Sequence, residues 1–207
     1  MDLRLPITSR PLGLVLATFV AAGCSAGAEG SLEAPATETL GAAESSTEAS
    51  SEHLGTLFSG NFYSFALPAD WEPADLSALG ADDVYFQSLD GRSTLTVEYL
   101  LLADYDLTLA SYLTETISIV EEKTGTEPES TEPTVLDGEP ATLRIYHFPF
   151  EGVPSYVLVI AISRESSRDP GGTGTMLAWW SDAGNETRDR ATFDAIRESY
   201  AEYEFEQ

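Results

Sequence analysis

The chain has 207 residues and carries 35 aspartates and glutamates against 10 lysines and arginines, a formal charge of −25. Such an acidic protein repels phosphates, which argues against nucleic-acid binding and against docking on anionic lipid by charge. The single cysteine excludes an intramolecular disulfide, and no CxxC or Cys/His cluster suits zinc. We expect no metal and no cofactor. The acidity keeps three explanations open: a soluble exposed domain, a salt-adapted organism, or a basic partner.

The first residues have the pattern of an export signal. Arg4 and Arg10 supply positive charge, and residues 11–22 are nearly all apolar. This run is shorter than the roughly 17–25 residues of a membrane-spanning helix and is typical of a signal peptide. The small residues Ala21, Ala22 and Gly23 before Cys24 resemble the bacterial lipobox, in which the cysteine is lipidated and becomes the first residue of the mature protein. We predict a lipoprotein signal peptide at 1–23 and lipidation at Cys24; a secretory signal with an incidental cysteine is the alternative.

Lipidation would fix where the protein resides. The resemblance to bacterial lipoproteins implies a diacylglyceryl group with chains such as palmitate, and two or more chains anchor a protein stably. The predicted location is the extracytoplasmic face of the cell membrane. Residues 24–53 are small, polar and acidic without aromatic side chains, so they predict a disordered tether that spans roughly 30 Å. Residues 54–207 form the predicted folded domain.

Strand and helix signals alternate in the first half of this domain. Three strands are predicted, at residues 62–67, 84–89 and 94–100. Asp90 and Gly91 between the last two predict a hairpin with a type I′ turn. A stripe of apolar residues between Thr108 as N-cap and Gly125 as terminator predicts a helix. Residues 127–133, with three glutamates and two prolines, predict an exposed loop.

The second half of the domain is also predicted to consist of strands followed by a helix. Strands are predicted at residues 142–148, 156–162 and 176–180, and the second is apolar on both faces, as in a strand covered on both sides. A closing helix at 187–200 would bury Phe193, Ile196 and Tyr200. The predicted fold class is α+β, a central antiparallel sheet covered by helices.

Five motifs carry a family resemblance: FYSFALPADW at 62–71, STLTVEYL at 93–100, TLASYL at 108–113, LDGEPATLRIY at 136–146 and FDAIRESY at 193–200. In this order they resemble the PsbP-like superfamily, especially the LpqN-type lipoproteins of actinobacteria, over nearly all of residues 57–203. The resemblance implies a PsbP-like sandwich, preceded here by the signal peptide and linker. It implies no shared catalytic motif, and related domains are accessory, adaptor or envelope-associated proteins.

The sequence offers few groups for catalysis. His53 lies at the end of the tether, which leaves His147 as the one histidine in a predicted strand. A nucleophilic serine needs a base, and no GxSxG motif is present. We therefore expect no enzyme activity; an enzyme would require His147 to be clustered with carboxylates or a serine in a cleft.

Aromatic residues form the candidate binding surface. Trp179 and Trp180 are adjacent on a strand and must point to opposite faces, so either both are buried or one lines a groove. Phe148 and Phe150 belong to a predicted hairpin tip. We predict that these four residues contact an envelope protein or lipid, and that the domain is a noncatalytic binding or adaptor module. The alternative is a carrier or chaperone for a lipid or other apolar envelope molecule.

Overall fold

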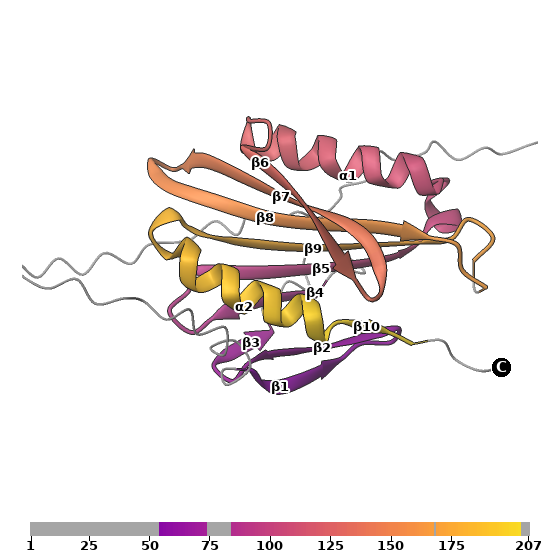
Figure 1. Cartoon of the computed structure of the whole chain (residues 1–207), viewed down its shortest axis with the longest axis horizontal. Helices are drawn as coiled ribbons and strands as arrows, with labels where there is room; N and C mark the ends of the chain where they lie inside the picture. Colours follow the sequence, from indigo (N-terminus) through magenta and orange to yellow (C-terminus); the bar gives the residue numbers. More distant parts are fainter. Residues whose placement is uncertain (1–53, 74–83, 168, 204–207) are drawn as a thin grey trace, which may run out of the picture.

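The computed structural model describes residues 54–73, 84–167 and 169–203, and over these residues the chain is α+β, with two antiparallel sheets and two α-helices (Figure 1). The predicted signal peptide, the tether and Cys24 lie outside the described residues, so these assignments stay predictions. No helix of the described part is long and apolar enough to span a membrane.

A seven-stranded sheet forms the centre of the domain, in the order β3-β4-β5-β9-β8-β7-β6. The strands are β3 (Trp71–Pro73), β4 (Val84–Ser88), β5 (Ser93–Leu101), β6 (Ser130–Leu136), β7 (Glu139–Phe150), β8 (Val153–Arg164) and β9 (Thr173–Asp182). Residues 155–162 of β8 are all buried, which confirms the strand that the sequence predicted to be covered on both faces.

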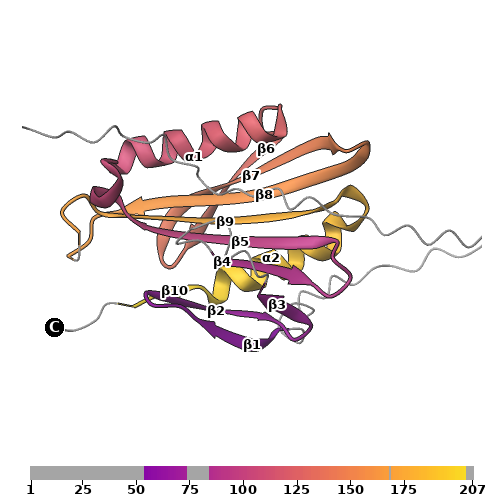
Figure 2. The same ribbon diagram turned by 180° about the vertical axis from the view of Figure 1, so that it is seen from behind.

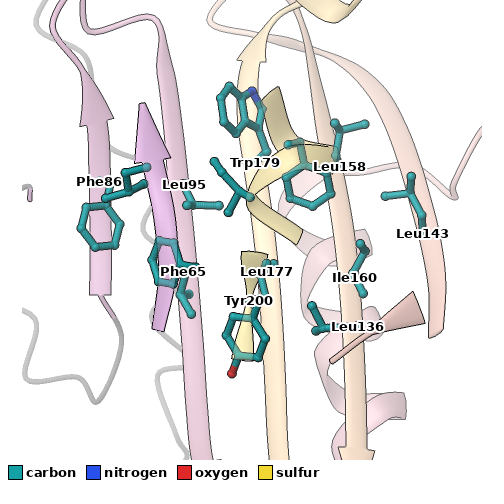
Figure 3. Close-up of a cluster of buried hydrophobic side chains, with 14 of the residues drawn as sticks. Phe65, Phe86, Leu95, Leu136, Leu143, Leu158, Ile160, Leu177, Trp179 and Tyr200 are labelled. Atoms are coloured by element: carbon teal, nitrogen blue, oxygen red, sulfur yellow. The ribbon is translucent and has the colours of Figure 1, made fainter. Parts of the chain in front are cut away.

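One face of this sheet packs against α2 (Glu186–Ser199) and a small second sheet, with β2 (Tyr63–Pro68) between β1 (Leu54–Ser59) and β10 (Ala201–Glu202). Ser199 Oγ on α2 accepts a hydrogen bond from Ala66 N on β2, at 2.9 Å. Figure 3 shows side chains from both sheets gathered in this core, among them Phe65, Phe86, Leu95, Leu158, Ile160, Leu177, Trp179 and Tyr200. A helix therefore packs on each face of the sheet, and on this face a second sheet, which the sequence analysis did not predict, packs beside α2.

The opposite face packs against α1 (Leu109–Thr124), which lies along β7, β8 and β9 (Figure 1). The predicted helix ends are confirmed. Thr108 Oγ1 accepts from Ser111 N at 3.1 Å, Ser111 Oγ accepts from Thr108 N at 2.8 Å, and Gly125 ends the helix with a φ of 70°. Short 3-10 helices occupy Leu102–Tyr105 and Ala183–Asn185.

Two local predictions are wrong. The β4–β5 connection is longer than a type I′ turn, because Gln87 pairs with Thr94 and Gly91 alone in the connection has a positive φ. Ser88 Oγ holds this loop by donating to Asp90 Oδ1 at 2.7 Å. The predicted acidic loop at 127–133 instead enters β6 at Ser130, since Pro133 is tolerated on an edge strand.

Candidate functional site

Three of the four predicted surface aromatics come together. The rings of Phe148 and Phe150 on β7 meet the ring of Trp180 on β9 edge-on, with centroids 5.0 and 4.8 Å apart. We call these three residues the aromatic cluster. They share one face of the sheet because alternate strand residues point the same way, and they continue the apolar layer beneath α1.

The aromatic cluster lies toward the open end of that face. The β7–β8 hairpin extends beyond the end of α1 in both views (Figures 1 and 2). Phe148 is only 7% exposed. The sequence suggested that it is exposed at the hairpin tip, but it is buried and packs against Trp180. Phe150 and Trp180 are half-buried and form the accessible part. The structure places these residues, and their binding role stays a prediction.

Trp179 does not belong to this surface. It points to the other face and is 1% exposed. Its ring centroid lies 4.6 Å from that of Trp71 and 6.3 Å from that of Phe193. The grouping of both tryptophans into one surface is therefore wrong, and Trp179 is a core residue.

His147 is clustered with two carboxylates, one of the arrangements that an enzyme would require. Its Nε2 is hydrogen-bonded to Glu186 Oε2 at 2.8 Å, and its Nδ1 lies 2.9 Å from Glu129 Oε2 without hydrogen-bond alignment. The two carboxylates lie on opposite ring nitrogens, so the three side chains do not converge on one ion. No group of three or more metal-ligating residues within the described ranges could hold a metal.

A buried carboxylate that the sequence analysis missed lies under the first turns of α2. Asp189 is 2% exposed. Its Oδ2 accepts hydrogen bonds from Tyr156 OH at 2.9 Å, Ser93 Oγ at 3.3 Å and Trp179 Nε1 at 3.4 Å. Its Oδ1 contacts both Nε and Nη2 of Arg188 at 2.9 Å. The carboxylate is thus saturated with donors, which a buried charge requires.

The hydrogen-bond network around Asp189 extends to both β5 and β9. Burial and the charge of Asp189 raise the pKa of the Tyr156 hydroxyl far above its ordinary value, so Tyr156 stays a hydrogen-bond donor. Ser93 Oγ also lies 2.9 Å from Ser181 Oγ, which joins β5 and β9 beneath α2. Asp189 lies four residues before Phe193 and seven before Ile196, so it belongs to the buried stripe of the helix. This spacing is the sequence signal that could have revealed the buried carboxylate.

A pocket of about 380 Å³ opens above this network, and its lining includes Trp71, Ser88, Asp90, Ser93, Arg188 and Asp189. A second pocket of about 410 Å³ lies beside the start of α1, at Thr108 and Asp169. Both carboxylate oxygens of Asp169 accept backbone hydrogen bonds there, from Ala103 N and Gly171 N, so Asp169 fixes the loop. His147 lines neither pocket.

Comparison with known proteins gives weak likenesses. No protein-family model and no curated protein matches the chain by sequence. A solved structure from Bacteroides thetaiotaomicron is 11% identical, with a TM-score of 0.45, over 69% of this chain and 45% of that one. Cyanobacterial PsbP (CyanoP) of Synechocystis is 16% identical, with a TM-score of 0.46, over 79% of this chain and 99% of that one.

LpqN of Mycobacterium tuberculosis, a protein involved in cell envelope biogenesis, is 12% identical, with a TM-score of 0.43, over 69% of this chain and 83% of that one. Of the Bacteroides protein, this chain spans less than half the length. PsbP and LpqN, the two names to which the sequence motifs pointed, are among these similar structures. Similarities at this level carry no argument about function, and membership of the PsbP-like superfamily stays a prediction.

Proposed function

We propose that the chain is a lipid-anchored envelope protein whose noncatalytic domain binds another envelope protein through the aromatic cluster. The observation that supports this is the pair Phe150 and Trp180, half-buried and held edge-on at the outer end of a sheet face. Aromatic anchors that are rigid before binding lose little conformational entropy and dominate many protein interfaces.

Charge favours a protein over a lipid surface as the partner. Glu151 follows Phe150 at the hairpin tip, Asp182 ends β9 two residues after Trp180, and the chain carries a charge of −25. Anionic lipid is repelled by such a surface, whereas a protein with an apolar pocket and a basic rim complements it. The partner expected here therefore presents basic residues around a small apolar pocket.

The anchor has its own test. Replacing Cys24 by serine removes the only thiol and should move the protein from the membrane fraction into the medium, as measured by fractionation and immunoblotting. A Cys24→Ser protein that stays with the membrane would overturn the lipoprotein assignment. The binding role is tested separately, so either part can fail alone.

The binding surface is tested by photo-crosslinking of the tethered protein in its own membrane. A photoreactive residue at Val153, 47% exposed at the start of β8, should capture one defined protein, and the capture should disappear in a Phe150→Ala, Trp180→Ala double variant. The matched control is the same probe at Leu57, 68% exposed on β1, which should not capture that protein. Capture that is independent of the two aromatics overturns the proposed surface, and capture of lipid instead supports the carrier alternative.

A further inference from the structure

The pocket above Asp189 has the features of a small ligand site, and it is separate from the aromatic cluster. It lies where β3, the β4–β5 loop and the first turns of α2 meet, and its volume is about 380 Å³. We propose that this pocket binds a neutral saccharide, one or two sugar rings, on the indole ring of Trp71. This binding goes beyond the proposed protein-binding function and does not depend on it.

The apolar wall of the pocket is a tryptophan pair. Trp179 is buried and Trp71, with its centroid 4.6 Å away, is half-buried. Trp179 therefore supports one side of Trp71 and leaves Trp71 as the accessible aromatic surface. The face of an indole ring is electron-rich and attracts the polarised C–H groups that a pyranose ring presents on its apolar side.

The polar wall offers a donor that is already fixed in place. Arg188 contacts Asp189 through Nε and Nη2, so its guanidinium plane is held by a buried carboxylate. Its Nη1 has no hydrogen-bond partner among the described residues and can donate to a ligand. Its side chain is otherwise exposed at the pocket. A donor whose geometry is set before binding costs little entropy when the ligand arrives.

The opposite rim offers an acceptor that is also fixed. Asp90 Oδ1 accepts from Ser88 Oγ at 2.7 Å and from Arg92 N at 3.1 Å. Within the described part of the chain Oδ2 has no donor, so it can accept a ligand hydroxyl. The Ser88 hydrogen bond, followed by the Arg92 N–H, lowers the pKa of Asp90, so this acceptor stays ionised at neutral pH. A sugar hydroxyl both donates and accepts, and it can use Asp90 and Arg188 at once.

The same residues argue against charged ligands. An anion would meet the carboxylates of Asp70 and Asp90, while the charge of Arg188 is already compensated by Asp189. A cation would gain little from Asp189 for the same reason, and Asp70 and Asp90 are exposed to water, which weakens their attraction. A hydroxylated neutral ligand with an apolar face suits all of these groups.

The test is saturation-transfer NMR on the purified full-length protein with glucose, galactose, mannose, arabinose and N-acetylglucosamine at millimolar concentrations. We expect transfer to at least one sugar, and Trp71→Ala should weaken its binding at least about fivefold. Leu57→Ala is the control, because it removes an exposed apolar side chain on β1 that does not line the pocket and should leave the affinity unchanged. Transfer to no sugar, or equal binding by Trp71→Ala, overturns the proposal.

A second variant keeps the test valid if Trp71→Ala does not fold. Asp90→Asn preserves the acceptor for Ser88 and Arg92 and replaces the oxygen that would face the sugar by a donor, at an exposed loop position. It should weaken binding about threefold or more. Arginine, tetramethylammonium and inorganic phosphate serve as competitor probes; binding of any of these in place of the sugars overturns the proposal as well.

Discussion

The hydroxyl of Tyr156 on strand β8 donates a hydrogen bond to Asp189 Oδ2 on α2, at 2.9 Å. Both residues are buried. The bond therefore fixes the first turns of α2 on the sheet and sets the floor of the pocket. Because the carboxylate is away from water, its donors are needed for folding as well as for geometry.

Replacing Asp189 by asparagine should destabilise the domain strongly. One amide oxygen cannot serve both Arg188 and the donors on Oδ2, so the amide NH2 must face a group that also donates. We expect a loss of about 2–4 kcal/mol in the free energy of unfolding, measured by urea denaturation. Tyr156→Phe should cost about 1.5–3 kcal/mol, because it removes one hydrogen bond to a charged group.

The control for this prediction is Asp194→Asn, which alters a partly exposed carboxylate of the same helix paired with Arg190 and Arg197. Such surface pairs contribute less than about 1 kcal/mol. Equal losses in the Asp189 and Asp194 variants would show that the buried network does not hold α2.

We predict that ionisation of buried Tyr146 lowers the stability of the domain at alkaline pH. Burial, with a smaller effect from the charge of Glu121, raises the pKa of its hydroxyl to about 12, while the unfolded chain has a value of about 10. The unfolded state therefore releases the proton first, and the stability is complete below pH 10 and falls as the pH rises toward 12.

Tyr146→Phe removes this dependence. The hydroxyl has no hydrogen-bond partner among the described residues, so at pH 7 the variant should be as stable as the native protein or more stable. At pH 11 it should exceed the native protein by about 1 kcal/mol more than at pH 7, as measured by urea denaturation. Tyr156 and Tyr200 also have raised pKa values. Both residues are present in the native protein and in the variant, so their effects cancel in the stability difference between the two proteins. An unchanged difference between the two pH values would contradict the prediction.

Gly174 lies directly beneath the ring of Tyr112. A Cβ at this position would come 2.7 Å from Cζ and 2.8 Å from both Cδ atoms of that ring. The ring cannot shift easily, because Tyr112 is fully buried and its hydroxyl donates to Glu98 Oε1 at 3.1 Å. Gly174→Ala should therefore destabilise the domain by about 1–3 kcal/mol in urea denaturation.

Gly184→Ala is the matched control for Gly174→Ala. A Cβ at Gly184 meets nothing within 4 Å, and its φ is not in the left-handed region. The change in stability should stay within about 0.5 kcal/mol. If both alanines were tolerated equally, the close packing of Tyr112 on β9 would be disproved.

Local signals predicted much of the fold, and long-range pairing explains what they missed. Thr108 and Gly125 marked the ends of α1 because capping depends on neighbouring residues. The second sheet was missed because β10 has two residues, Ala201 and Glu202, whose pairing with β2 depends on the completed fold. β6 was missed because Glu132 and Pro133 disfavour a strand, whereas pairing with β7 and the 2.7 Å contact between Glu132 and Arg190 support it.

The candidate site shows the same limit. The sequence placed Phe148 and Phe150 at a hairpin tip, and alternation along β7 puts them on one face. It could not predict that Trp180 and not Trp179 joins them, because this choice depends on the register of three strands. That register pairs Trp180 with Val157 and Val157 with Tyr146, which places Trp180 on the same face as Phe148.

The two tryptophans should differ sharply when each is replaced by alanine. Trp179→Ala removes a buried ring from the core together with its contacts to Trp71 and Phe193, and should cost about 3–5 kcal/mol. Trp180→Ala removes a half-buried ring whose edge-on contacts are with the aromatic cluster, and should cost about 1–2 kcal/mol. Urea denaturation followed by circular dichroism measures both without relying on tryptophan fluorescence. Equal losses would mean that Trp180 is as much a core residue as Trp179, and the aromatic cluster would then stabilise the sheet without serving as a contact surface.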